Sequence, residues 1–226
     1  MSLNIPMPRE QLERIVRQIV RERLSASQPG PAAGTYVPNL VVNMSARHMH
    51  VSQADLDRLF GPGAQLTVYR WLYQPGEFAS EQTVTIVSPA GKRIEMVRIL
   101  GPVRQASQVE ISATDAFALG MDVPVRASGN MEGTPGCVVI GPAGSVELRQ
   151  GVIRAERHAH LAPADAEYYG FTDGQYVRLR VTGERTTTFE HVLCRVHANF
   201  LLEVHLDTDE GNACDLPNAR DVELLP

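Results

Sequence analysis

Three absences narrow the classes of protein that this 226-residue sequence can encode. It has no apolar run of 18 residues and no apolar core of a secretory signal, so we expect neither a membrane partner nor secretion. The three cysteines are widely spaced and form no CxxC pair, which is typical of reduced thiols in an intracellular protein. An excess of positive charge is also lacking: the formal net charge is -5 and no basic face is predicted outside the N-terminus, which argues against a nucleic acid partner.

The sequence does contain one motif that is used twice. Arg47-His48-Met49-His50 recurs 110 residues later as Arg157-His158-Ala159-His160, each time after an apolar run (39–44 and 151–153) that is typical of a strand. A strand points residues i and i+2 to the same face, so each histidine pair can offer two imidazoles to one metal ion. A single His-x-His is more often an accident of the surface or core, and it is the repetition that favours metal binding.

A third ligand for each pair comes from a second place where the two halves align. Gln108-Val109-Glu110-Ile111 corresponds to Glu203-Val204-His205-Leu206, so Glu110 falls where His205 does. His-His-Glu and three-His sets with an open position are recurrent catalytic zinc arrangements. We therefore predict two related metal sites, formed by His48, His50 and Glu110 and by His158, His160 and His205. The other two histidines, His191 and His197, lie outside this frame and are interpreted as ordinary strand or surface residues.

The rest of the chain predicts a mainly β protein with a separate N-terminal segment. Residues 7–24 have the apolar spacing of an amphipathic helix, and residues 25–34 have the composition of a linker. This segment is interpreted as a docking or targeting peptide, the alternative being a helix that folds back on its own domain. The repeat predicts two related small β-barrel domains capped by short helices, at 47–154 and at 35–46 together with 155–226.

Local patterns predict the individual elements. Helices are expected at 52–60, capped by Ser52, and at 163–169, ended by Gly170. The loops 74–78 and 128–136 are long enough to carry binding function. A turn is expected at Gly101-Pro102, with Arg104 beside the metal to hold a carboxylate or phosphate. Strands are expected at 84–87, 93–100, 108–111, 138–140, 145–148, 176–181, 192–196 and 201–206, with hairpin turns at 89–91, 142–144 and 182–184.

Six motifs together resemble the phosphate propanoyltransferase family, the phosphotransacylases of bacterial microcompartments that degrade propanediol and related compounds. The motifs are S-A-R-H-x-H (45–50), Q-P-G-x-F (74–78), V-R-I-L-G-P-x-R (97–104), Q-V-E-I-S-x-T-D (108–115), R-H-x-H (157–160) and H-x-D-T-D-E (205–210). The resemblance covers about residues 37–215. It implies two β-barrel domains, two zinc ions at their junction, and reversible acyl transfer between coenzyme A and phosphate.

The resemblance also assigns roles to single residues. The family's zinc ligands match the six residues reached from the repeat, and its phosphate-contacting arginine matches Arg104. Its coenzyme A contacts match Ser45, Arg70, Arg98, Leu100 and Asn212, although Arg70 stands where the family usually has lysine and Gly211 where it usually has alanine. The family's packaging peptide matches residues 7–24, which implies shell or core proteins as partners, the lumen of a microcompartment as location, and a homodimer or larger homo-oligomer.

Two other functions share some of these features. A zinc-dependent hydrolase of a small ester or thioester would use the same His-His-Glu set but needs no coenzyme A groove. A non-catalytic, metal-stabilised, shell-associated module would have closed and usually cysteine-rich sites, whereas these sites have three ligands and no cysteine. A covalent acyl-enzyme is not expected, and Cys214, near the His205 segment, is the one thiol to test. The sequence leaves open which acyl chain (acetyl, propanoyl or lactoyl) and which metal the protein uses.

Overall fold

The computed structural model describes residues 36–226, and the architecture below belongs to residues 38–226, which form one compact unit. The predicted helix at 7–24 and the linker at 25–34 lie outside the described residues. Within the described part of the chain, no helix has the length and apolar character that crossing a membrane requires.

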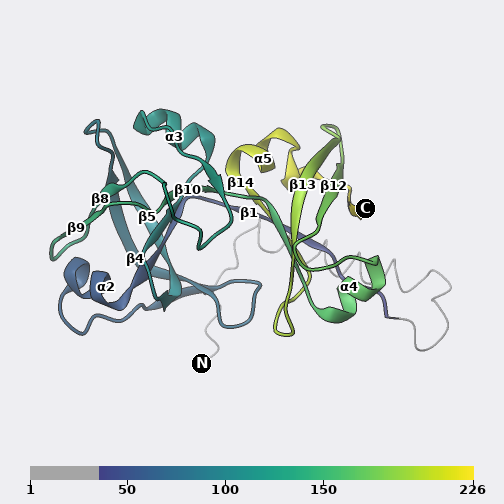
Figure 1. Ribbon diagram of the computed structural model, residues 1–226, viewed down its shortest axis with the longest axis horizontal. Helices are drawn as coiled ribbons and strands as arrows, with labels where there is room; N and C mark the ends of the chain where they lie inside the picture. Colours follow the sequence, from purple (N-terminus) through teal and green to yellow (C-terminus); the bar gives the residue numbers. More distant parts are fainter. Residues whose placement is uncertain (1–35) are drawn as a thin grey trace, which may run out of the picture. The chain divides into compact units, whose positions relative to one another are not determined.

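Two curled sheets, each forming about half a barrel, make up the fold (Figure 1). The first sheet runs in the order β7-β10-β6-β2-β5-β4-β8-β9, with β3 beside β4. Its strands are β2 (His48–Ser52), β3 (Val68–Trp71), β4 (Phe78–Val87), β5 (Arg93–Arg104), β6 (Gln108–Glu110), β7 (Val125–Arg126), β8 (Cys137–Ile140), β9 (Ser145–Leu148) and β10 (Val152–Ala155).

The second sheet runs in the order β1-β14-β11-β13-β12-β15. Its strands are β1 (Val41–Ser45), β11 (His158–Leu161), β12 (Tyr176–Thr182), β13 (Thr187–Val196), β14 (Glu203–Asp207) and β15 (Asp221–Leu225). The short helices are α2 (Gln53–Phe60), α3 (Ala113–Leu119), α4 (Pro163–Tyr169), α5 (Thr208–Ala213) and the 3-10 turn η1 (Leu216–Asn218). The predicted mainly β fold is therefore confirmed, while the division into two domains remains a prediction.

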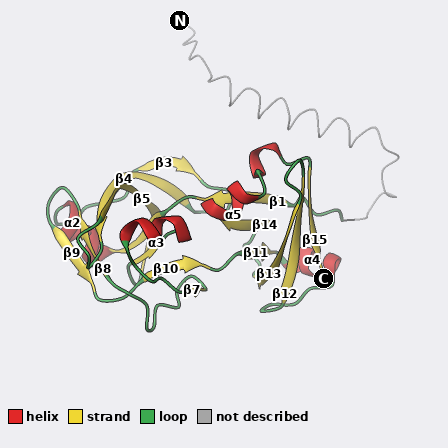
Figure 2. Ribbon diagram, turned by 90° about the horizontal axis from the view of Figure 1, so that it is seen from above, coloured by secondary structure: helices red, strands yellow, loops and turns green. Residues whose placement is uncertain are grey.

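The two sheets exchange strands with each other. β1 precedes β2 in the chain but pairs with β14 of the second sheet, beside which it lies in Figure 2. β10 precedes β11 but pairs with β6 of the first sheet. The chain therefore passes from one sheet to the other twice, between Ser45 and His48 and between Ala155 and His158. Because each histidine pair begins directly after a crossing, both pairs start at the junction of the sheets.

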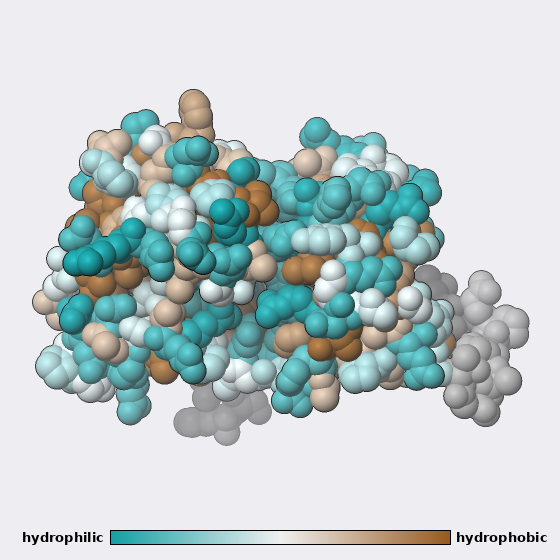
Figure 3. Space-filling view, in the orientation of Figure 1, coloured by the Kyte–Doolittle hydropathy of each residue, from teal (hydrophilic) through white to brown (hydrophobic). Residues whose placement is uncertain are grey.

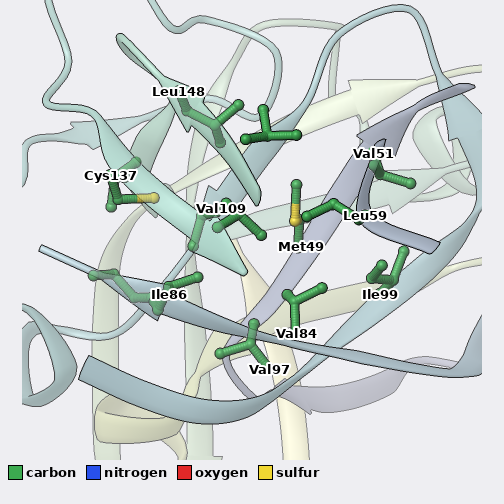
Figure 4. Packing of buried hydrophobic residues seen from close by; sticks show 14 of the residues in the cluster. Met49, Val51, Leu59, Val84, Ile86, Val97, Ile99, Val109, Cys137 and Leu148 are labelled. Carbon is green, nitrogen blue, oxygen red and sulfur yellow. The ribbon is translucent and has the colours of Figure 1, made fainter. Parts of the chain in front are cut away.

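Each sheet has its own apolar core, built by strand alternation. Met49 and Ala159, the middle residues of the two His-x-His motifs, are fully buried in separate cores, so the flanking histidines point to the other face. Figure 4 shows Met49 packed among Val84, Val97 and Val109 in the first core. On the face seen in Figure 3, hydrophilic residues predominate and hydrophobic ones occupy small areas.

Most predicted elements are found, and the differences have physical causes. α2 and α4 have the predicted bounds and ends, and β4, β5 and β13 are longer than expected. The predicted turn at Gly101-Pro102 is wrong: this cis dipeptide lies inside β5, where the Phe78 ring covers Gly101 so closely that a Cβ there would lie 2.2 Å from it. Helices α3 and α5 were not predicted, because only their capping boxes signal them (Ser112 with Asp115, Asp207 with Glu210).

Candidate metal centre

The first predicted ligand set meets on one face of the first sheet. β2 lies between β5, which runs parallel to it, and β6, which runs antiparallel, and the register places His48 opposite Glu110. His48, His50 and Glu110 are all buried, and each offers a ligand atom within 4.8 Å of the others.

The distances within this set suit a shared ion better than direct hydrogen bonds. His48 Nε2 lies 3.5 Å from Glu110 Oε2, and His50 Nε2 lies 3.6 Å from Glu110 Oε1, both beyond ordinary hydrogen-bond length. Two ligand atoms bound at about 2.0–2.1 Å to one tetrahedral zinc ion lie roughly 3.3–3.4 Å apart. The set therefore fits a metal ion that would occupy the space between the three side chains.

The second set is built in the same way on the second sheet. β11 lies between the parallel β13 and the antiparallel β14, and the register places His158 opposite His205. His158, His160 and His205 also offer ligand atoms within 4.8 Å of one another. Neither ring nitrogen of His160 has a hydrogen-bond partner among the described residues, although its side chain is buried. An unpartnered buried imidazole is costly, and a metal ion would satisfy one of its two nitrogens.

The first histidine of each pair is held in one tautomer by the backbone. His48 donates from Nδ1 to the carbonyl of Ala46 at 2.9 Å, and His158 donates from Nδ1 to the carbonyl of Glu156 at 2.8 Å. In both cases the proton on Nδ1 leaves the Nε2 lone pair free, as a metal ligand requires. The repeated motif thus carries its own orienting group two residues upstream.

The supporting residues of the two sets differ, and sequence reasoning missed them. Glu110 Oε1 accepts hydrogen bonds from Gln108 Nε2 at 2.6 Å and from Ser128 Oγ at 2.7 Å, which leaves Oε2 for a metal. In the second set the carboxylate of Glu203 lies 3.1 Å from His205 Nε2. Gln74 Nε2 donates to Glu203 Oε2 at 2.7 Å. The predicted binding loops 128–136 and 74–78 supply Ser128 and Gln74, which was the available signal.

Burial and charge set the protonation states that metal binding needs. Burial is the main reason why the pKa of His50 and of His158 falls to about 4, and it also holds the pKa of His160 well below its usual range. Burial alone would raise the pKa of the Glu110 carboxyl, but His48, His50 and the Ser128 hydrogen bond hold it well below normal. Neutral imidazoles beside an ionised carboxylate are the forms that bind a divalent ion.

Two residues of each set line one small pocket. Its volume is about 30 Å³, which is room for about two water-sized groups. The backbone crossings form its walls, and the ligand residues that face it are His48, Glu110, His158 and His205. The arrangement can therefore present two metal ions to one small shared space.

Comparison with known proteins gives the family. A family model described as phosphate propanoyltransferase matches residues 41–217. The chain belongs to the phosphate propanoyltransferase family. It is 49% identical over 223 residues to the phosphate propanoyltransferase of Planctopirus limnophila, covering 96% of this chain and 91% of the relative. It is 54% identical over 180 residues to that of Thermotoga maritima, covering 79% of this chain and 85% of the relative. It is also 45% identical over 219 residues to that of Lachnoclostridium phytofermentans, covering 97% and 100% respectively.

The residues predicted to contact coenzyme A lie on strands of both sheets and on α5. Ser45 lines the pocket, and its hydroxyl lies 3.3 Å from His205 Nδ1. Arg70 is exposed on β3, and Asn212 is exposed on α5. Leu100 is half-buried opposite His50. The Arg98 guanidinium lies over the ring of Tyr69 at 4.6 Å and donates to the Ser80 carbonyl, so this arginine already has internal partners.

Arg104 and Cys214 have opposite surroundings. Arg104 lies at the end of β5, donates to Ser128 Oγ at 3.2 Å and is 4.0 Å from Glu77, with 39% of its side chain exposed. Ser128 in turn donates to the Glu110 carboxylate, so two successive hydrogen bonds connect Arg104 with this predicted ligand. Cys214 is buried in the second core, and burial raises the pKa of its thiol. A protonated core thiol is a poor nucleophile.

Proposed function

We propose that the chain transfers a short acyl group, with propanoyl as the expected one, reversibly between coenzyme A and phosphate at a two-zinc site. The observation that carries the proposal is the pair of three-ligand sets, His48, His50 and Glu110 and His158, His160 and His205, with two residues of each lining one pocket. Membership of the phosphate propanoyltransferase family supports the reaction class. Three protein ligands in each set leave a position for a reacting group.

The reaction balances without a protein nucleophile. An oxygen of hydrogen phosphate forms a bond to the thioester carbonyl carbon, and the carbon–sulfur bond breaks with its electron pair on sulfur. The phosphate proton ends on the coenzyme A thiol, and the products are the acyl phosphate and free coenzyme A. Zinc held by these ligands would supply Lewis-acid stabilisation of the carbonyl oxygen and the departing sulfur.

The chain's own residues position the reactants. Arg104 offers a planar guanidinium beside the first ligand set, suited to bind two phosphate oxygens and offset their charge. Ser45 lies at the second set, beside His205, and is proposed to contact coenzyme A together with Arg70, Arg98, Leu100 and Asn212. Holding phosphate and thioester in contact converts a bimolecular step into one within the complex.

The test is thiol release from propanoyl-CoA by the zinc-loaded protein, measured with and without phosphate. We expect free thiol to be released much faster with phosphate than without it, with propanoyl phosphate formed in an amount equal to the thiol. Metal content measured on the same sample should give two zinc ions per chain. A matched series with acetyl-CoA and lactoyl-CoA then ranks the acyl groups.

The same assay separates the proposal from its rival. A zinc hydrolase of thioesters would use the same ligand sets but release thiol at a rate independent of phosphate and form the free acid. Thiol release without phosphate at the full rate would therefore overturn acyl transfer in favour of hydrolysis. No thiol release under either condition, with zinc bound, would instead favour a non-catalytic module.

We further propose that residues 7–24 direct the enzyme, as a homodimer or larger homo-oligomer, into the lumen of a bacterial microcompartment, where it would return coenzyme A to upstream enzymes. The amphipathic pattern of these residues and the linker that follows support this role. Deleting residues 1–34 should leave the transfer rate unchanged and abolish co-purification with shells. A truncated enzyme that still co-purifies with shells would contradict it.

A further inference from the structure

A second arginine approaches the metal centre from the other sheet, at a position that the sequence repeat does not reveal. Arg195 lies on β13, directly opposite His160 of β11 in the parallel ladder. Directly paired residues in a ladder point to the same face, so Arg195 shares the face of the ligand His160. The equivalent position in the first sheet, opposite His50, holds Leu100.

Arg195 has no ion pair or hydrogen bond to any residue in the described range 36–226, although it is half-buried. Arg104, by contrast, has partners within the protein: it donates to Ser128 and lies 4.0 Å from Glu77. A half-buried guanidinium without a protein partner keeps its five N–H donors available to a ligand. An anion that enters the site would supply the acceptors.

The electrostatics agree with this geometry. The positive charge of Arg195 is among the causes, after burial, that lower the pKa of His158 and of His160. It also opposes the protonated form of Arg104, whose pKa is lowered mainly by burial. The like charges of the two guanidiniums therefore oppose each other. Such repulsion is relieved when a doubly charged anion lies between them.

We propose that Arg195 is a second phosphate-binding residue, which together with Arg104 holds the tetrahedral oxyanion of the transfer reaction between the two sheets. This inference rests on the proposed function for the identity of the anion. The first sheet contributes Arg104 from the strand parallel to β2, and the second contributes Arg195 from the strand parallel to β11. A complete phosphate site would thus need both sheets, with one arginine from each.

The test is direct binding of inorganic phosphate to the full-length, zinc-loaded protein by titration calorimetry, without acyl-CoA. Arg195→Gln should weaken phosphate binding roughly ten- to hundredfold, as expected for lost hydrogen bonds to a charged group. Arg195→Lys keeps the charge and should lose less. Arg180→Gln, an exposed arginine of β12 in the same sheet, is the matched control and should bind phosphate as the parent does.

Steady-state kinetics give the second readout. The KM for phosphate should rise by the same factor as the dissociation constant in Arg195→Gln, while the KM for propanoyl-CoA and the zinc content stay unchanged. An unchanged phosphate affinity, a rise confined to the KM for propanoyl-CoA, or a loss of zinc would each overturn the proposal. If no variant or parent transfers acyl groups but Arg195→Gln still loses phosphate binding, the proposed function fails and the anion site stands. If Arg195→Gln does not fold, Arg195→Lys decides: a phosphate affinity below that of the parent supports the proposal, and an unchanged affinity overturns it.

Discussion

The two ligand sets have the same backbone frame and opposite distributions of charge. In each, the first histidine faces the third ligand across an antiparallel pair, and the second histidine faces a polar residue, Gln108 or Glu203. In the first set the ligand is a carboxylate and the polar neighbour is an amide that donates to it. In the second set the ligand is an imidazole and the neighbour is a carboxylate beside it. Each set thus has one buried carboxylate, but at exchanged positions.

This exchange gives the two sets different expected metal chemistry. A carboxylate ligand cancels part of the charge of its ion, so the first ion would be the weaker electrophile. A neutral three-imidazole set leaves its ion more positive, and the nearby Glu203 orients the ligand instead. With metal ions bound, the repeated frame would therefore hold two electrophiles of different strength. The predictions that follow break the two halves separately.

The largest effect is expected from removing the charge of the first set. Glu110→Gln keeps the size of the side chain and its contact with Ser128 but removes an anionic ligand. We expect the zinc content to fall from two ions per chain to one and the transfer rate to fall about a thousandfold or more, because a metal contributes several kcal/mol to such reactions. Elemental analysis and the thiol-release assay measure both. Glu167→Gln, on an exposed face of α4, is the control.

A smaller effect is expected from the supporting carboxylate of the second set. Glu203→Gln should weaken zinc binding at that set by about 10- to 100-fold, the usual cost of losing an orienting partner, while the first set keeps its affinity. Competition with a chelator should then show one weakened and one unchanged site. Equal weakening of both sites would mean that the two sets are not independent, and the comparison of halves would fail.

The sequence predicted which side chains come together, because a strand has a period of two and the repeat marks which residues correspond. His48 with His50 and His158 with His160 needed only that alternation, and Glu110 and His205 needed only the second alignment. The family resemblance supplied the activity, which no periodicity contains. Arg195 could not be recognised as a neighbour of the centre, because its place depends on the pairing of β13 with β11. For Gln74 the only signal was the predicted binding loop 74–78, and for Glu203 it was the alignment with Gln108; neither signal named the contact between the two side chains.

The exchange of strands between the two sheets could not be predicted either, because it also depends on pairing between distant segments. β1 and β10 are short apolar runs, and nothing in their composition says which sheet they join. The Gly101-Pro102 turn was wrong because Pro and Gly usually end a strand. Here β5 continues past them to Arg104. Glycine is needed at residue 101 because the Phe78 ring packs where a side chain would be.

A third prediction concerns the connection between the sheets. Gln74, from the loop between β3 and β4, donates to the Leu201 carbonyl at 2.9 Å and accepts from the Leu201 amide at 3.1 Å, besides its bond to Glu203. Gln74→Ala removes all three hydrogen bonds, one of them to the buried Glu203, and should lower the free energy of unfolding by about 1–3 kcal/mol. Urea denaturation measures it, with the exposed Gln150→Ala as control. A change in unfolding free energy equal to that of the control would show that these hydrogen bonds between the loop and the second sheet do not stabilise the fold.

The smallest effects are expected from two matching arginines. Arg47 precedes the first His-x-His and binds Asp115 through two contacts, of 2.7 and 3.0 Å, and Arg157 precedes the second and contacts Glu210 at 3.1 Å. Each acidic partner is the third residue of a helix with a capping box, so each arginine ties the start of a ligand strand to a helix.

The two pairs differ in burial, and this decides which matters more. Asp115 is buried, whereas both members of the Arg157 pair are partly exposed and screened by solvent. Arg47→Ala should therefore cost about 1 kcal/mol of unfolding free energy and Arg157→Ala about 0.5 kcal/mol or less. Paired urea titrations at low and at high salt measure the difference, and salt should reduce the smaller effect further. The reverse order would mean that the shared frame, rather than the burial of the acidic partner, sets the strength of these contacts.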